Sequence, residues 1–227
     1  MGARESQLDT LARGLGIDAA DAALVASVTH SSYAAEHRVE SNERLEFLGD
    51  AVVGLVIAER AYRELDLPEG GLAQVRQATV SEPSLAEASR GLGLDEVLRL
   101  GRGEEATGGR GRDSLLADAY EAVVAAVYLR EGLEEARALV LRTLDERFRA
   151  EARDPGASDA KSRLQEWSEA KGLGAPHYEV TGDGPGHERR YTATVRIGGA
   201  VVGTGEGTSK KVAELAAARA AWEQRDA

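Results

Sequence analysis

The sequence has no cysteine, a single methionine and few aromatic residues, which make up only 4% of its 227 positions. The absence of cysteine excludes disulfide bonds and zinc sites built on cysteine. Long hydrophobic runs are also missing, because the longest uncharged segment, residues 22–35, has 14 residues and contains several polar side chains. Such a segment is too short to span a bilayer, and the first residues lack the apolar stretch of a signal peptide. The sequence therefore predicts a cytoplasmic protein with no membrane contact.

Positive charge is scarce as well, with 28 Lys and Arg residues against 39 Asp and Glu and a formal net charge of −11. Because nucleic acids are polyanions, an acidic chain is not typical of a nucleic-acid-binding protein, and composition alone favours an acidic metabolic enzyme. The excess is uneven, however: from residue 158 onward 10 basic and 10 acidic residues cancel, and all four lysines lie in this part. The whole negative excess therefore belongs to the N-terminal part of the chain.

Helical periodicity dominates the N-terminal two thirds, where alanine supplies much of the apolar content. Residues 43–64 and 113–130 are long apolar stretches, and residues 131–150 carry apolar positions at helical spacing. A stretch rich in proline, glycine and other helix breakers follows. We therefore predict an all-helical N-terminal domain over residues 1–150 and a linker over residues 151–158.

The C-terminal part has a different pattern, with alternating apolar and polar positions between two helical segments. Its Gly198-Gly199 pair is typical of a two-residue hairpin turn. The predicted elements are a helix at 159–171, strands at 177–181, 191–197 and 200–204, and a helix at 209–225. The fold class is thus mainly α, with an all-helical domain followed by a small α-β-β-β-α domain over residues 159–227.

Three acidic residues lie on one face of the first long helical stretch. Glu43, Glu46 and Asp50 are spaced i, i+3 and i+7, which places them within an arc of roughly 60°. A solvated acidic face at the start of a helix is the ordinary interpretation of such a pattern. Here the opposite face and the following turns are apolar, which predicts that the helix is largely buried. Carboxylates clustered in a buried helix repel one another unless a cation joins them.

A second acidic pair lies in the other long apolar stretch. Asp118 and Glu121 are i, i+3 neighbours with apolar residues on both sides. Two such groups on separate buried helices indicate facing helices that share a site of oxygen ligands. Hard oxygen ligands select Mg²⁺ or Mn²⁺, and an ion held there can activate water for attack on a phosphodiester.

The residues around these carboxylates resemble the motifs of the ribonuclease III family. Residues 42–50 (Asn-Glu-Arg-Leu-Glu-Phe-Leu-Gly-Asp) match the family's nine-residue signature throughout, and residues 116–122 resemble its second acidic motif. The order and separation of the two motifs also fit, as does the segment 101–112. The resemblance covers nearly the whole chain.

The resemblance implies roles for individual residues. Asp50 and Glu121 match the positions usually described as the active site, and Glu46 and Asp118 join them as ligands of Mg²⁺, for which Mn²⁺ substitutes. Glu43 and Glu69 match further acidic positions near the cleavage centre. Phe47 matches an aromatic residue that packs into the partner subunit of a homodimer, although a core phenylalanine is an equal alternative.

The resemblance also implies the reaction. Members of the family cleave double-stranded RNA, each subunit cutting one strand, and leave 5′-phosphates, 3′-hydroxyls and short 3′ overhangs. Processing of ribosomal RNA precursors and other structured RNAs is the corresponding role.

The predicted C-terminal domain resembles the double-stranded RNA-binding domain, which contacts 2′-hydroxyls and phosphates of A-form RNA. Ser209 is a candidate N-cap, and free backbone N–H groups at a helix start favour phosphate. A solvated helix start and an ordinary loop histidine are the alternatives for these residues taken singly. The positions that match the domain's RNA contacts are Gln165, Glu166, His187, Ser209, Lys210 and Lys211.

Three alternatives fit the sequence less well. Residues 101–106 formally fit a dinucleotide-binding glycine pattern, but Gly-rich and charged residues follow them rather than a helix, so we expect no nucleotide cofactor. A non-catalytic RNA-binding protein with a degenerate nuclease fold should lack acidic ligands, and none is missing. A metallohydrolase of small phosphate esters would leave the C-terminal domain unexplained.

Overall fold

The computed structural model describes residues 3–153, 155, 160–183 and 189–224 and divides the chain into two compact units, Met1–Arg153 and Asp154–Ala227. Each unit has its own hydrophobic core. Among the described helices, none combines the length and the apolar composition needed to cross a bilayer.

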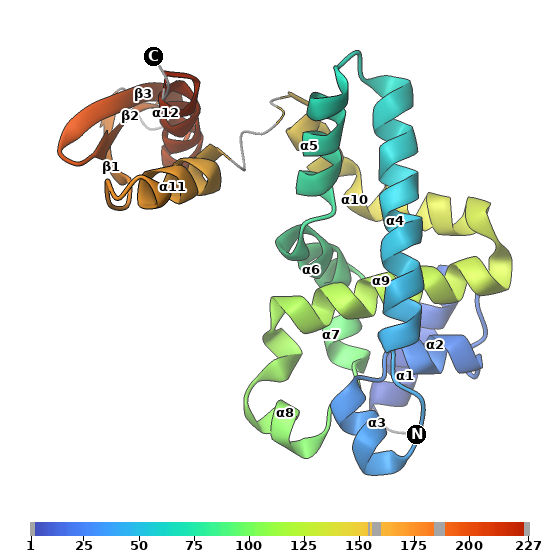
Figure 1. The fold of residues 1–227 in the computed structure, drawn as a ribbon. Coiled ribbons are helices and arrows are strands. Elements are labelled where there is room, and N and C mark those ends of the chain that lie inside the picture. Colours follow the sequence, from blue (N-terminus) through green and yellow to red (C-terminus); the bar gives the residue numbers. More distant parts are fainter. Residues whose placement is uncertain (1–2, 154, 156–159, 184–188, 225–227) are drawn as a thin grey trace. The chain divides into compact units, whose positions relative to one another are not determined.

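The N-terminal unit is helical throughout, as its periodicity predicts (Figure 1). The predicted stretch 43–64 corresponds to α4 and the stretch 113–130 to α9. The elements are α1 (Ala3–Leu15), α2 (Ala22–Ser27), α3 (Ser31–His37), α4 (Glu43–Glu64), α5 (Glu69–Thr79), α6 (Glu82–Gly91), α7 (Leu94–Val97), α8 (Arg102–Ala106), the 3₁₀ turn η1 (Gly109–Gly111), α9 (Asp113–Glu131) and α10 (Leu133–Arg153).

Helix α9 forms the centre of this unit, with α4 crossing it (Figure 1). Between Leu115 and Val127 every residue of α9 is buried except Asp118 and Glu121. Such continuous burial explains why the sequence of this helix is apolar on all sides. The two half-exposed carboxylates are therefore the only breaks in the buried part of the helix.

Helix α4 differs from the prediction that it is largely buried. One face packs into the core, but a second apolar row points away from it, and Phe47, Leu55 and Tyr62 are 83%, 54% and 78% exposed. The prediction was wrong because an apolar helix face has the same sequence pattern whether its own chain covers it or not. The buried row comprises Val52, Val53, Val56, Ile57 and Ala61.

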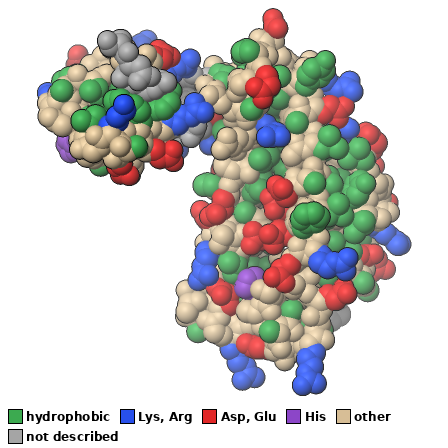
Figure 2. All heavy atoms as spheres, viewed as in Figure 1, with side chains coloured by type: hydrophobic (Ala, Val, Ile, Leu, Met, Phe, Trp, Pro, Cys, Tyr) green, Lys and Arg blue, Asp and Glu red, His purple; other side chains and the backbone are tan. Residues whose placement is uncertain are grey.

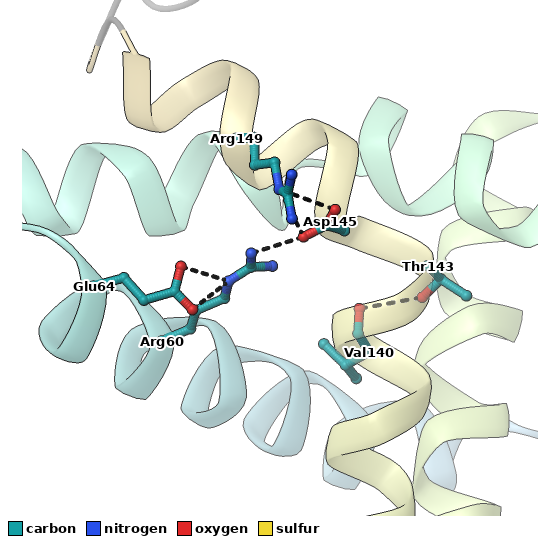
Figure 3. A network of polar contacts seen from close by, with 6 residues as sticks. All are labelled: Arg60, Glu64, Val140, Thr143, Asp145 and Arg149. Carbon is teal, nitrogen blue, oxygen red and sulfur yellow. Dashed lines mark hydrogen bonds and ion pairs between the residues drawn. The ribbon is translucent and has the colours of Figure 1, made fainter.

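Arg60 joins the second half of α4 to α10 (Figure 3). Its Nη2 donates to Asp145 Oδ1 over 2.7 Å, and its Nε donates to Glu64 over 3.1 Å. The guanidinium also lies 4.0 Å from the centre of the Phe148 ring. Since the Arg60 side chain is only 10% exposed, these interactions are screened less than a surface ion pair. The network fixes α4 against α10.

The C-terminal unit has the predicted order of helix, three strands and helix. The strands form an antiparallel sheet in the order β1-β2-β3. Gly198 and Gly199 form the turn between β2 and β3 with φ of +59° and +85°, values that glycine adopts without strain. The elements are α11 (Ala160–Ala170), β1 (His177–Asp183), β2 (Arg190–Ile197), β3 (Ala200–Gly207) and α12 (Lys210–Gln224).

Strand β3 packs directly on α12 because its inward positions lack side chains. A Cβ atom on Gly203 or Gly205 would overlap backbone atoms of Ala217, and one on Gly207 would overlap the backbone nitrogen of Ala213. Glycine on the strand and alanine on the helix thus allow the two backbones to approach closely. This contact holds the first turn of α12 beside the end of the sheet.

Candidate functional site

The two acidic helices touch at a glycine. A Cβ atom on Gly49 would overlap the carbonyl oxygen of Glu121, so α4 and α9 cross with their backbones in contact. Glu46 and Asp50 flank Gly49 along α4, and the crossing places them opposite Asp118 and Glu121. The contact at Gly49 therefore sets the distance between the two acidic pairs.

Three carboxylates meet at this crossing. One carboxylate oxygen each of Glu46, Asp118 and Glu121 lies within 4.8 Å of the others, and all three side chains are half-buried. Asp50 is exposed at the rim and acts electrostatically on both Glu46 and Glu121. Figure 2 shows acidic side chains gathered on this face, with hydrophobic side chains alongside. The structure thus groups three of the four predicted carboxylates, and Asp50 lies outside the group.

Among the described residues, no Lys or Arg lowers the pKa of these three carboxylates. Burial, followed by the charges of Asp50, Asp118 and Glu46, raises the pKa of Glu121 to about 8. Burial and the neighbouring carboxylates, Asp118 foremost, also raise the pKa of Glu46. Burial raises the pKa of Asp118, while His30 acts in the opposite direction. The shifts indicate a site with excess negative charge, which either protons or a metal ion can balance.

The donor set fits a divalent cation. All three grouped ligands are carboxylates, and hard oxygen donors of this kind suit Mg²⁺ or Mn²⁺ better than the softer ions that histidine and cysteine favour. The raised pKa values give an independent reason, because a cation would replace the proton that Glu121 otherwise holds.

The other predicted residues of this unit lie at different distances from the cluster. Glu43 is exposed and accepts a 2.7 Å hydrogen bond from Ser41 Oγ. Its charge also raises the pKa of Glu46, although burial and the charge of Asp118 contribute more. Glu69 begins α5, beyond the opposite end of α4 (Figure 1), and a single chain does not bring it to the cluster. The exposure of Phe47 excludes the alternative of a core phenylalanine.

The C-terminal unit presents its candidate RNA contacts on two helices. Gln165 and Glu166 are exposed on α11. Ser209 Oγ accepts a 3.2 Å hydrogen bond from the backbone N–H of Val212, which confirms it as the N-cap of α12. The lysines at 210 and 211 are exposed in the first turn of that helix. His187 lies outside the described residues.

Sequence reasoning missed two residues of the site. Gly49 lies within the nine-residue signature, but its own role was not predicted. Glycine inside a helix lowers helix stability by about 1 kcal/mol relative to alanine, so its presence there could have indicated a close backbone contact. His30 has no distinguishing pattern in the sequence, yet its side chain caps α3.

Two family models match the chain. Residues 21–147 match a model described as ribonuclease-III-like, and residues 160–225 match the double-stranded RNA binding motif. The chain is 50% identical over 216 residues to the Ribonuclease 3 of Streptomyces coelicolor, covering 94% of this chain and 78% of that protein. It is 49% identical over 211 residues to the Ribonuclease 3 of Thermobifida fusca, with coverage of 92% and 88%.

A solved structure agrees with the N-terminal unit. The nuclease domain of ribonuclease III from Campylobacter jejuni is 35% identical, with a TM-score of 0.58. The match covers 62% of this chain and 98% of that domain. That domain has structural flexibility in a region involved in dimer formation.

Proposed function

Since the chain belongs to the ribonuclease III family, we propose which of its residues catalyse the cleavage of double-stranded RNA and which bind the RNA. The chain is an endoribonuclease that hydrolyses phosphodiester bonds of duplex RNA. The observation that carries the site assignment is the meeting of Glu46, Asp118 and Glu121 at the crossing of α4 and α9. We propose residues 1–150 as the catalytic domain, 151–158 as the linker and 159–227 as the RNA-binding domain.

The carboxylates of Glu46, Asp50, Asp118 and Glu121 would hold Mg²⁺, with Mn²⁺ as a substitute. A bound divalent ion supplies positive charge to the scissile phosphate and activates the attacking water. The attack forms a bond from water oxygen to phosphorus and breaks the bond from phosphorus to O3′, which takes up a proton. The products therefore carry a 5′-phosphate and a 3′-hydroxyl.

The chain's own residues prepare the site for this reaction. The buried stretch of α9 forms its floor and excludes water from beneath Asp118 and Glu121. The contact at Gly49 holds α4 against that floor, and Arg60 fixes the second half of α4 to α10. Asp50, exposed at the rim, is open to the incoming strand. Fixed carboxylates of this kind need no reorganisation when the phosphate arrives.

We propose that two chains associate through the exposed row of α4. Phe47, Leu55 and Tyr62 lie on the same side of the helix, and exposed apolar patches commonly mark interaction surfaces. Two copies would present two sites to one duplex, so that each cuts one strand and a short 3′ overhang results. Glu43 and Glu69 are auxiliary acidic residues of this assembly.

Phe47→Asp is expected to convert the dimer into a monomer, because it places a charge in a desolvated interface. Sedimentation equilibrium of the full chain measures the change. Ala138→Asp is the matched control, since Ala138 is exposed on a different helix, α10, and it should leave the dimer intact. A Phe47→Asp chain with the mass of the wild-type species would contradict the interface.

In the C-terminal unit, Lys210→Ala combined with Lys211→Ala is expected to weaken duplex binding and to lower the slope of log affinity against log salt by about 1 per lysine. Both residues lie at the capped start of α12, where backbone N–H groups and lysine charge favour phosphate. Fluorescence anisotropy with an RNA duplex at several salt concentrations measures the affinity and this slope. Lys171→Ala, at an exposed position after α11, is the control, and equal slopes for both variants would contradict the assignment.

One assay tests the function as a whole. The purified chain is incubated with a long RNA duplex and, separately, with single-stranded RNA and a chromogenic phosphate ester, each with Mg²⁺ or with a chelator. We expect only the duplex with Mg²⁺ to be cut. Binding without cleavage would indicate a non-catalytic RNA-binding protein, and hydrolysis of the small ester would indicate a general phosphoesterase. We propose structured cytoplasmic RNAs, ribosomal precursors among them, as the natural substrates.

A further inference from the structure

His30 is held rigidly at the start of α3. Its backbone N–H donates to the carbonyl oxygen of Arg99 over 3.1 Å, and its own carbonyl accepts from the N–H groups of Tyr33 and Ala34 over 3.0 Å. The side chain caps the helix, since Nδ1 accepts a 3.2 Å hydrogen bond from the backbone N–H of Ser32. Both the backbone and the ring are therefore fixed before any substrate binds.

These contacts determine where the ring carries its proton. A backbone N–H can only donate, so Nδ1 must offer a lone pair to Ser32. Ser32 Oγ lies 2.8 Å from the same nitrogen and accepts a 2.9 Å hydrogen bond from the N–H of Gly101, which leaves its own proton to point at Nδ1. With Nδ1 accepting these hydrogen bonds, the N–H of the ring is on Nε2.

The Nε2 edge faces a different environment. Across the described residues, no hydrogen bond reaches Nε2, and the side chain is partly exposed. The carbonyl oxygen of the preceding residue, Thr29, accepts a 2.8 Å hydrogen bond from the backbone N–H of Asn42, whose own carbonyl accepts from the N–H of Glu46 over 2.8 Å. His30 therefore lies beside the start of α4, the helix that carries Glu46. A nitrogen with no hydrogen-bond partner among the described residues thus lies beside the start of the helix that carries Glu46.

Capping alone does not explain a histidine at this position. Asn, Asp and Ser are the preferred N-cap residues, and each would accept the hydrogen bond from Ser32. What histidine adds is a second nitrogen, held in place by the cap and pointing away from it. The cap contact orients the ring, and the donor on its other side remains available.

We propose that His30 positions the substrate by donating a hydrogen bond from Nε2 to a phosphate oxygen of the RNA strand in the site. A neutral donor suits this place because it binds an anionic oxygen without adding a permanent cation that would compete with the metal. The inference rests on the proposed function and assigns to that reaction a residue outside the acidic motifs.

Two substitutions separate the donor from the cap. His30→Asn keeps an acceptor near the position of Nδ1 and loses the donor, whereas His30→Gln extends an amide N–H toward the position of Nε2 and loses the cap. We expect His30→Asn to lower kcat/KM for a short duplex by about 10²-fold with an unchanged melting temperature. His30→Gln should melt earlier yet stay within about tenfold of wild-type kcat/KM. His30→Ser, a second cap without the donor, should behave like His30→Asn.

The Mg²⁺ dependence distinguishes this role from an indirect one. If His30 only held Asp118, His30→Asn would raise the Mg²⁺ concentration for half-maximal rate, and that result would overturn the inference. Wild-type kinetics of His30→Asn and His30→Ser would overturn it as well. His37→Gln, at the exposed end of α3, is the control and should cleave normally. A wild-type chain that did not cut the duplex would overturn the proposed function and this inference together.

Discussion

Glu121→Gln is expected to lower the rate of Mg²⁺-dependent duplex cleavage on the order of 10³-fold. The substitution keeps the size of the side chain but removes a charged oxygen from the group formed with Glu46 and Asp118. Duplex binding should remain within about twofold, because the RNA contacts of the C-terminal unit are untouched. Single-turnover cleavage and anisotropy with the same RNA measure the two effects, and Asp50→Asn should give the same separation.

Glu121→Gln should also change how the stability of the folded chain depends on pH. Burial and the charges of Asp50, Asp118 and Glu46 raise the pKa of Glu121 from 4.5 to about 8 in the folded chain. Over that window the folded protein binds a proton that the unfolded chain has released, so the free energy of unfolding falls as pH rises from about 4.5 to about 8. Glutamine does not titrate. The metal-free Glu121→Gln chain should therefore melt a few degrees above the metal-free wild type at pH 8, and at similar temperature below pH 4.5.

Mg²⁺ should reverse this order, because it balances the charge that destabilises the wild type. Glu131→Gln is the matched control: it lies at the exposed end of the same helix and should change neither cleavage nor the pH dependence of melting. Cleavage by Glu121→Gln at the wild-type rate would contradict the site assignment. An equal pH dependence of melting in both chains would contradict the electrostatic account of it.

Much of the fold follows from the sequence because its signals are local. The periodicity of residues 43–64 and 113–130 depends on neighbours three and four positions apart, and the structure has α4 and α9 at these places. The C-terminal strands alternate with a period of two around Gly198-Gly199, and the sheet forms with that turn. In both units the pattern and the local conformation agree, which is typical of sequences that fold uniquely.

What could not be predicted depends on contacts between distant segments. The exposed row of α4 looks like a core face in the sequence, because hydrophobic spacing does not say which chain covers it. The placement of Glu69 away from Glu46 depends on the direction in which the chain returns after α4. The carboxylates were recognisable singly and as pairs. Their meeting depends on where α4 crosses α9, and a single glycine allows that crossing.

Gly49→Ala tests that crossing and is expected to be the most damaging small substitution in the N-terminal unit. The added methyl group would overlap the carbonyl oxygen of Glu121, which is backbone and cannot rotate away. The helices must then separate, at a cost of about 3 kcal/mol or more in the free energy of unfolding. The separation also moves Glu46 and Asp50 away from Glu121, and a displacement near 1 Å lowers rates by about 10²-fold.

Gly54→Ala on the same helix isolates the contact from the effect of glycine itself. A Cβ atom on Gly54 meets nothing within 4 Å, and alanine favours a helix interior over glycine by about 1 kcal/mol. Gly54→Ala should therefore be at least as stable as wild type and fully active, whereas Gly49→Ala should unfold at lower denaturant and cleave slowly even where it is folded. Urea melts and single-turnover cleavage of both variants measure this contrast. If Gly49→Ala matched Gly54→Ala in both measurements, backbone contact between α4 and α9 would not be what sets the geometry of the carboxylates.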